Sequence, residues 1–250
     1  MEARPKLPDA ALQAARLNET YGSEDAAAII ELATKLFRDD GGIAAISSFG
    51  ADSAVLLHMI SRVDPDLPIV FLDTGQHFGE TLGYRDQLAA DLGLRNIINL
   101  TPLSASIADK DPDAVLYQAD PDLCCAIRKV EPMARAVEPY AAWFTGRKRH
   151  QAQTRAEMPV FEAVGDRIRI NPLAAWTTAE QAAYMRAHNL RENPLVAFGY
   201  HSVGCFPCTK PVEPGQDARS GRWAGAAKTE CGIHLTGLEN ALASTTRTAS

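Results

Sequence analysis

The chain has 250 residues, of which 46% are hydrophobic and 22% charged, and its 25 basic and 31 acidic side chains give a formal net charge of −6. This balance is typical of a folded globular protein and excludes the disordered, collagen-like and fibrous classes. The acidic total argues against nucleic acid as a general partner, because a polyanion is bound through clustered basic side chains. The sequence has no run of about 18 apolar residues, so we expect neither a transmembrane helix nor a membrane partner.

The N-terminal segment mixes acidic and basic residues with no apolar stretch, so we expect no secretory signal and predict a cytoplasmic protein. In that reducing compartment, five cysteines are expected to serve as ligands or nucleophiles rather than as disulfide partners. The length predicts one domain over residues 1–235, with a solvated tail over residues 236–250. Monomer and homo-oligomer both fit the sequence.

Apolar residues recur at helical spacing through residues 1–38, which predicts N-terminal packing helices. The following segments alternate between apolar runs of strand length and helical patterns, in the order strand 43–49, helix 55–63, strand 68–74, helix 80–92 and strand 96–102. Apolar strands that alternate with helices indicate a mainly parallel sheet with helices on both faces. We therefore assign residues 43–200 to an α/β core.

The second half of this core has a less regular pattern. Residues 105–122 are polar and contain aspartate and proline, which predicts a loop or short helix. The later elements are predicted as a helix at 126–137, strands at 141–146 and 167–174, and a helix from Thr177 or Thr178 to His188. After Asn193 the chain is rich in glycine, proline and basic residues without periodicity, which predicts an irregular C-terminal region, with the candidate metal-binding loop and catalytic segment within residues 201–235.

Polar residues follow the first two predicted strands. The carboxyl ends of parallel strands lie at one edge of the sheet, where α/β proteins bind ligands, and a helix N-terminus after the first strand would favour an anion. We therefore predict a nucleotide site there, although a plain connection with Asp52 or Ser53 as helix cap is an alternative for the first loop. The residues concerned are Ser47, Ser48, Phe49, Gly50 and Ser53 after the first strand, and Leu72, Asp73, Thr74 and Gly75 at the second.

Four of the five cysteines form two pairs. Cys124 and Cys125 are adjacent, and Cys205 and Cys208 form a CxxC motif whose glycine and proline predict a tight loop. Four thiolates suit Zn²⁺ or an iron–sulfur cluster. Adjacent cysteines would crowd one tetrahedral ion, whereas a [4Fe–4S] cube offers each of them its own iron. The sequence therefore favours the cluster, with zinc and unliganded buried cysteines as alternatives.

The fifth cysteine, Cys231, lies in the segment KTECGIHL among small and polar residues. Such a thiol is expected to be exposed, which suits a nucleophile carried to a substrate by a moving segment. An ordinary surface cysteine is the alternative.

Basic residues gather in three places despite the acidic total. Two of these sets lie at other candidate sites, and this joint placement fits a compact anion such as a phosphosulfate, whereas each set alone would fit a solvated charged face. The sets are Arg128 with Lys129, then Arg147, Lys148, Arg149, His150 and Arg155, and finally Arg219 with Arg222.

Taken together, these segments resemble the assimilatory adenylylsulfate (APS) and phosphoadenylylsulfate (PAPS) reductases. The match runs from about residue 43 to residue 235 and includes SSFGADSAV, LDTG, CC…RKVEP, WFTGRKRHQAQTR, INPL, SVGCFPCTKP, GRW and ECGIHL. Within this family, a cysteine pair together with CxxC marks the members that hold a [4Fe–4S] cluster and mostly reduce APS. This chain has all four of those cysteines.

The resemblance implies an adenine nucleotide α-hydrolase-like fold and an enzyme that reduces APS to sulfite and AMP, with thioredoxin or glutaredoxin as reductant. It implies that Cys231 is the nucleophile and carries an S-sulfonate, and that Lys129, Arg219 and Arg222 hold the phosphosulfate. The two strand-end segments would bind the nucleotide, and the cysteine pairs would bind the cluster. The flexible basic loop over the ligand would run from Gly146 to Arg149 and include Arg155, with Gly146, Lys148, Arg149 and Arg155 as its substrate-binding residues.

Two residues of the basic loop depart from the family pattern. Arg147 stands where relatives commonly have an apolar residue, and His150 where they commonly have an acid. Because an extra arginine could pair with the 3′-phosphate of PAPS, a PAPS reductase or a dual-substrate enzyme is the nearest alternative. More distant alternatives are a tRNA thiolase of the same fold and a non-catalytic iron–sulfur redox sensor.

Overall fold

The computed structural model describes residues 9–40, 42–223, 232–234 and 238 of the chain. The α-helices are α1 (Ala10–Tyr21), α2 (Ala26–Arg38), α3 (Ser53–Val63), α4 (Gly79–Leu92), α5 (Ser104–Lys110), α6 (Leu116–Ala119), α7 (Pro121–Cys125), α8 (Glu131–Val137) and α9 (Thr178–Ala187). The strands are β1 (Ile43–Ile46), β2 (Ile69–Leu72), β3 (Ile97–Leu100), β4 (Ala142–Phe144), β5 (Phe161–Val164) and β6 (Arg167–Ile170). The shorter helical segments are the π-helix η1 (Ala126–Val130) and the 3₁₀ helices η2 (Arg149–Gln151), η3 (Gln153–Arg155), η4 (Pro194–Phe198), η5 (Phe206–Cys208) and η6 (Gly232–His234).

The strands form one sheet in the order β3-β2-β1-β4-β6-β5. All neighbouring strands are parallel except β5 and β6, which are antiparallel. This arrangement confirms the predicted, mainly parallel sheet. Strand β1 lies between β2 and β4, so the chain turns to opposite sides of β1 along its course. In α/β sheets, ligands bind in the crevice outside the carboxyl ends of the strands at such a reversal.

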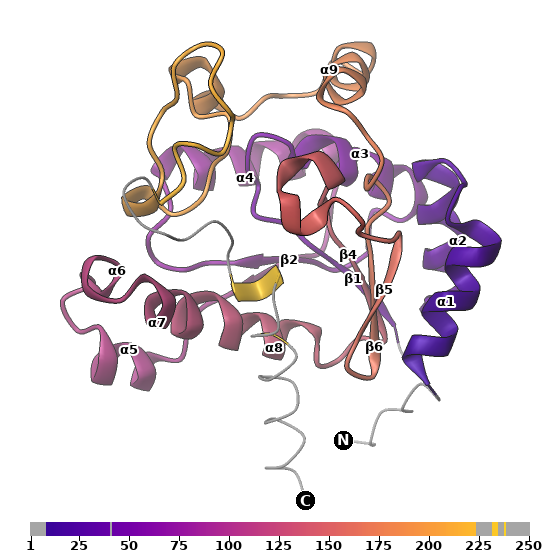
Figure 1. Ribbon diagram of the computed structural model, residues 1–250, viewed down its shortest axis with the longest axis horizontal. Helices are drawn as coiled ribbons and strands as arrows, with labels where there is room; N and C mark the ends of the chain where they lie inside the picture. The colour runs from indigo at the N-terminus through magenta and orange to yellow at the C-terminus, as the bar shows by residue number, and fades with distance from the viewer. Residues whose placement is uncertain (1–8, 41, 224–231, 235–237, 239–250) are drawn as a thin grey trace, which may run out of the picture.

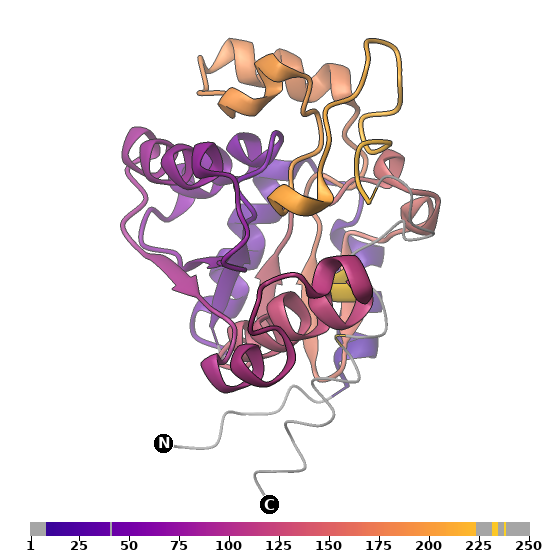
Figure 2. The same ribbon diagram turned by 90° about the vertical axis from the view of Figure 1, so that its left-hand side faces the viewer.

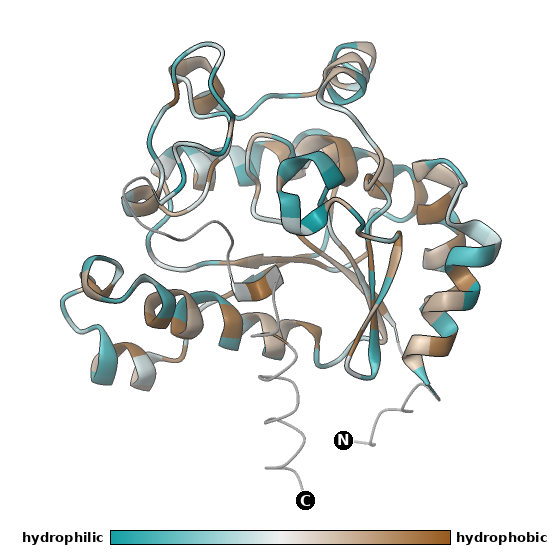
Figure 3. Ribbon diagram, in the orientation of Figure 1, coloured by the Kyte–Doolittle hydropathy of each residue, from teal (hydrophilic) through white to brown (hydrophobic). Residues whose placement is uncertain are grey.

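Helices cover both faces of the sheet, as predicted. Figure 1 shows α3 and α4 on one side of β1 and β2, with α5, α7 and α8 on the other, and Figure 2 shows the same layers from the side. In β2, Ile69 and Phe71 belong to the core on the α3 side, whereas Val70 and Leu72 pack in the cluster that includes residues of α8. Because both faces are buried, the strand is apolar throughout, and Figure 3 shows the central strands in brown.

The structure differs from the sequence-based expectation at several elements. Strand β5 was not predicted; it pairs with β6 across a tight turn in which Gly165 has a φ of 61°. The first predicted strand ends at Ile46, and residues 47–49 form a loop. Leu238 is fully buried in the α8-side cluster, although residues 236–250 were expected to form a solvated tail. An apolar side chain gains free energy by leaving water, which explains that position.

None of the helices in the described ranges combines the length and the apolar character needed to cross a bilayer.

Candidate active site

A cavity of about 860 Å³ opens at the carboxyl ends of β1, β2 and β4. Its wall combines the loops that follow these strands with η1, α9 and the segments 201–204 and 217–223. The sheet reversal at β1 therefore places this crevice where the sequence predicted the nucleotide site. The predicted site residues that line it are Ser47, Ser48, Gly50, Ser53, Leu72, Thr74, Lys129, Gly146, Arg155, Arg219 and Arg222.

Three predicted residues at the strand ends do not line this cavity. Phe49 is fully buried in the core, where its ring meets the Phe71 ring edge-on at 5.8 Å between centroids. Asp73 instead accepts a hydrogen bond at 3.0 Å from the backbone N–H of Gly75, which has a φ of 70°. Phe49, Asp73 and Gly75 therefore stabilise the loops after β1 and β2, and adjacent residues of these loops line the cavity.

Two predicted residues of the basic loop also point elsewhere. Lys148 is fully buried, and its Nζ donates to Asp52 Oδ2 at 3.1 Å. Burial lowers the pKa of Lys148, and the Asp52 carboxylate opposes that shift. Arg149 donates from Nε to the Met158 carbonyl oxygen at 2.9 Å. Lys148 and Arg149 therefore fasten the loop after β4 to its surroundings.

The N-terminus of α3 has no side-chain cap from Asp52. Besides the Lys148 ammonium, the Asp52 carboxylate accepts a hydrogen bond from Gln151 Nε2 at 3.2 Å. This aspartate thus joins the loop after β1 to the loop after β4 instead of satisfying the first N–H groups of the helix. Unsatisfied N–H groups and the helix dipole attract an anion.

A shared carboxylate organises the wall formed by β4 and β6. Arg147 Nη1 donates to Glu162 Oε2 at 2.5 Å, and Arg169 donates to both Glu162 oxygens at 2.9 and 3.0 Å. Asn171 Nδ2 adds a bond to Oε2 at 2.7 Å. Burial and the neighbouring charge of Arg169 lower the pKa of Arg147 to about 10, so its guanidinium stays protonated at neutral pH. Both arginines line the cavity.

The three remaining predicted cations come from two distant segments. Lys129 lies on the π-helix η1, and π-helical turns occur frequently at functional sites. Arg219 and Arg222 lie in the loop that precedes Trp223, and the Arg222 guanidinium lies 4.5 Å from the centre of the Trp223 ring. A Cβ atom at Gly204 would come within 2.2 Å of Arg222 Nη2. The glycine beside the CxxC motif therefore makes room for Arg222 at the cavity.

The two cysteine pairs meet near this end of the cavity. Burial raises the pKa of the Cys124 thiol to about 11, the charge of Arg128 opposes this shift, and nearby Cys205 and Cys208 add to it. Cys125 packs with Trp223 in a cluster that Cys208 also contacts. The fold thus brings together four thiols from separate segments, and none of them is in a disulfide. Within the described ranges, no three histidine, cysteine or acidic side chains are arranged to hold a single metal ion.

Cys231 lies outside the described residues, but the next residue is placed. A Cβ atom at Gly232 would come within 2.9 Å of Val130 Cγ2, and Val130 follows Lys129 directly. Ile233 lines the cavity and packs against the hydrophobic clusters on the α8 side and around Trp223. The C-terminal segment therefore reaches the wall that carries Lys129.

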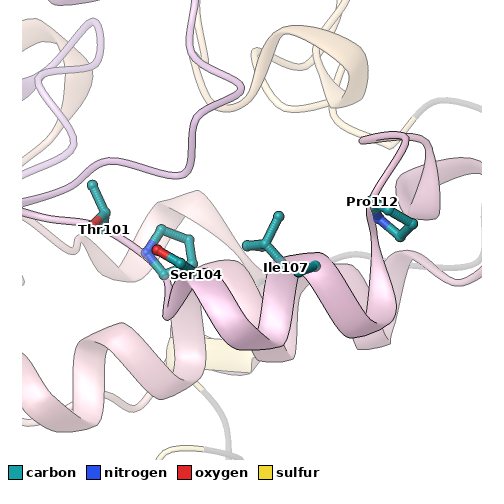
Figure 4. Close-up of a pocket in the computed structure, with 6 residues that line it drawn as sticks. Thr101, Ser104, Ile107 and Pro112 are labelled. Carbon is teal, nitrogen blue, oxygen red and sulfur yellow. The ribbon is translucent and has the colours of Figure 1, made fainter.

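A second hollow, of about 590 Å³, lies along α5 and is lined in part by Thr101, Ser104, Ile107 and Pro112 (Figure 4). None of the predicted site residues lines it. The candidate chemistry is therefore assigned to the larger cavity.

Residues 42–211, more than half of the chain, match the family described as the phosphoadenosine phosphosulfate reductase domain. The chain belongs to this reductase family.

Similar proteins extend this assignment over more than nine-tenths of the chain. An adenosine 5′-phosphosulfate reductase from Chelativorans sp. (strain BNC1) is 70% identical over 239 residues, which cover 96% of this chain and 98% of the relative. One from Mesorhizobium japonicum (strain LMG 29417 / CECT 9101 / MAFF 303099) is 66% identical over 233 residues, which cover 93% of this chain and 91% of the relative.

The fold agrees with solved structures as well. One is the crystal structure of a phosphoadenylyl-sulfate reductase from Candida auris in a phosphate complex. Its sequence is 27% identical, the TM-score is 0.69, and the match covers 84% of this chain and 100% of the Candida auris chain. An FMN adenylyltransferase from Candida glabrata is 17% identical with a TM-score of 0.52, and the match covers 90% of this chain and 88% of the transferase chain. At this low identity the likeness concerns the fold alone. The predicted adenine nucleotide α-hydrolase-like fold is confirmed.

Several residues of this reductase cavity were not predicted from its sequence. His77 lines the cavity, and its Nε2 lies 2.9 Å from the Leu72 carbonyl oxygen. Burial lowers the pKa of His77, the bond to Leu72 opposes the shift, and the charge of Lys129 adds to it. Its position two residues after LDTG was the available signal. Gln181 and Arg186 line the cavity from α9, for which the sequence predicted a helix without a functional role.

Proposed function

We propose that this chain is an oxidoreductase that reduces adenosine 5′-phosphosulfate to sulfite and AMP in assimilatory sulfate reduction. The extensive identity to adenosine 5′-phosphosulfate reductases carries this proposal. Support also comes from the cavity, which combines strand-end loops suited to a nucleotide with the cations Lys129, Arg219 and Arg222. A reducing cytoplasm is the compartment that suits such thiol chemistry.

In the first step, the Cys231 thiolate attacks the sulfur atom of the sulfate group. An S–S bond forms, the bond between that sulfur and the phosphate-bridging oxygen breaks, and AMP leaves with the electron pair. Lys129 and the two arginines would offset the charge that develops on the departing phosphate. Cys231 is left as an S-sulfonate.

The second step restores the thiol of Cys231. A thiolate of reduced thioredoxin or glutaredoxin attacks the Cys231 sulfur, and sulfite leaves with the electron pair of the broken S–S bond. A second thiol of the reductant then resolves the mixed disulfide and releases the Cys231 thiol. Both electrons of the reduction come from the dithiol, which becomes a disulfide.

We further propose that Cys124, Cys125, Cys205 and Cys208 hold a [4Fe–4S] cluster. The donor set fits this group, because four thiols from two segments come together without forming disulfides. Adjacent cysteines suit the separate irons of a cube better than one tetrahedral zinc ion. When bound, the cluster would supply local charge and a cross-link between the two segments. Because Lys129 lies four residues after Cys125, that cross-link would help to orient Lys129 toward the sulfate.

Reduction of the 3′-phosphorylated substrate PAPS is the second candidate, and the similarity to the Candida auris enzyme favours it. Arg147 was the residue expected to pair with the additional phosphate. Its Nη1 donates to Glu162, and the same guanidinium lines the cavity with further N–H donors, so the two substrates have to be compared directly.

The experiment that tests this function is steady-state turnover with each substrate at equal concentration, using anaerobically purified protein and reduced thioredoxin. We expect sulfite and AMP to form from APS with a higher kcat/KM than for PAPS. Cys231→Ser should abolish sulfite release without removing nucleotide binding. A higher kcat/KM for PAPS would instead support the second candidate, and no sulfite from either substrate would contradict both.

A further inference from the structure

The loop after β2 contacts the CxxC segment, which contains one of the two cysteine pairs. Cys205 forms an antiparallel bridge with His77, and the backbone N–H of Phe206 donates to the Gln76 carbonyl oxygen at 2.8 Å. The Thr74 hydroxyl lies 3.3 Å from Cys205 Sγ. These contacts therefore fix the position of the CxxC segment relative to the end of β2.

The other cysteine pair is connected to the same loop through Arg128. This arginine lies one helical turn after Cys124, and its Nη1 donates to the Thr74 carbonyl oxygen at 2.7 Å. Its Nε and Nη2 donate to Asp111 Oδ2 at 3.0 and 2.6 Å. The Arg128 and Asp111 side chains are only 6% and 1% exposed. Thr74 thus contacts Cys205 through its hydroxyl and the Cys124 helix through its carbonyl.

Asp111 uses its two oxygens for different partners. Oδ2 accepts both bonds from Arg128, and Oδ1 accepts the backbone N–H of Leu116 at 2.8 Å. An asparagine has one acceptor oxygen and one NH₂ donor, so it would lose one of these partners whichever way its amide is turned. The geometry therefore requires a carboxylate at residue 111.

We propose that Asp111 and Arg128 are positioning residues for the four-cysteine site. The Asp111 carboxylate holds the guanidinium fork of Arg128 against the Thr74 carbonyl, and this contact sets the separation between Cys124–Cys125 and Cys205–Cys208. The inference rests on the proposed cluster and adds two residues that do not ligate it. Groups that orient metal ligands act in this way, and their loss typically costs roughly ten- to a hundredfold in metal affinity.

The test compares anaerobically purified wild-type protein with Asp111→Asn and Arg128→Lys. Lysine keeps the charge of Arg128 but lacks the planar fork that reaches Asp111 and Thr74 together. Asp91→Asn is the matched control, because it breaks an exposed ion pair. The Asp91 side chain is 42% exposed, and the side chain of its partner Arg191 is 44% exposed. The measurements are iron and acid-labile sulfide per chain, the visible absorption of the cluster, and the rate of iron release to excess chelator.

We expect iron release to be roughly ten- to a hundredfold faster in Asp111→Asn and Arg128→Lys than in wild-type protein, with Asp91→Asn unchanged. Rates are measured well below each variant's unfolding midpoint, so that a general loss of stability does not mimic the effect. Wild-type release rates in both variants, with or without a lowered midpoint, would overturn the inference alone. Wild-type protein without iron and sulfide would overturn the proposed cluster and this inference together, while leaving sulfite formation from APS as a separate result.

Discussion

At the scale of single residues, two glycines determine how closely basic and C-terminal segments approach the cavity. Gly204 leaves space for the Arg222 guanidinium, and Gly232 leaves space for Val130 beside Lys129. In each case a Cβ atom would come closer than 3 Å to a neighbouring side chain. The positions of these cations and of the segment after Cys231 therefore depend on the absence of a side chain.

Gly232→Ala should lower kcat for sulfite release with little change in KM for APS. The added methyl group would displace η6 from Val130, and a misplacement of about 1 Å can cost up to about a hundredfold in rate. Steady-state kinetics with reduced thioredoxin measure both parameters. Gly83→Ala is the control, since nothing lies within 4 Å of a Cβ atom at that helical position. A wild-type kcat in Gly232→Ala would show that this close approach does not position the reacting segment.

Many cavity residues could be identified from the sequence because they lie within short, recognisable motifs. Ser47, Thr74 and Arg155 line the cavity as expected. It could not reveal that Lys148 points into the protein toward Asp52, since the direction of a side chain depends on the fold around it. Asp111 was missed for the same reason, because its partner Arg128 is 17 residues away in the chain.

At the scale of elements, the β5–β6 hairpin supports the loop after β4. Glu162 on β5 accepts hydrogen bonds from Arg147, which follows β4, and from Arg169 on β6. Burial alone would raise the pKa of Glu162, but its bonds to Arg169 and the charges of both arginines outweigh burial and hold this pKa below its usual value. The hairpin thus fixes two cavity arginines through one ionised carboxylate.

A carboxyl group whose pKa is lowered by folding stabilises the protein above its unfolded pKa, and that stabilisation is lost as the pH falls through the folded pKa. Glu162→Gln should therefore lower the free energy of unfolding at pH 7 by about 3 kcal/mol. This value lies near the lower end of the range for breaking a buried ion pair, because the Glu162 side chain is 17% exposed. The deficit should shrink as the pH falls below about 4.

Urea unfolding of Glu162→Gln and wild-type protein between neutral and acidic pH checks this prediction. Glu131→Gln is the control; it breaks a half-exposed pair with Arg135 on α8, which is worth less than about 1 kcal/mol. A deficit for Glu162→Gln that stays constant from pH 7 to pH 3 would contradict the assigned ionisation.

The elements that the sequence predicted well are those with a strong local pattern. Strand β2 is buried on both faces and apolar at every position, so it was evident as a strand. Strand β5 has a single neighbour and carries the partly exposed Glu162, so its pattern is weak over only four residues. The π-helix η1 was included in a predicted helix, since helical periodicity does not distinguish one wider turn.

At the scale of the whole molecule, the strand order assembles the site. The strand-end loops, the π-helix and the segment around Arg222 meet at one sheet edge because the strand order reverses at β1, which has β2 on one side and β4 on the other. The alternation of strands and helices predicted such an edge. It did not give the strand order, and so did not place Arg169 of β6 beside the loop that follows β4.

The proposed reaction depends on direct transfer of the sulfonate group from APS to Cys231. Anaerobically purified protein would be incubated with APS, and in parallel with PAPS, without any reductant, and the intact and peptide masses would be measured. We predict a gain of one SO₃ group on the peptide that contains Cys231 with APS, and none in Cys231→Ser. If the nucleotide is bound and that peptide carries no adduct, Cys231 is not the acceptor of the sulfonate group.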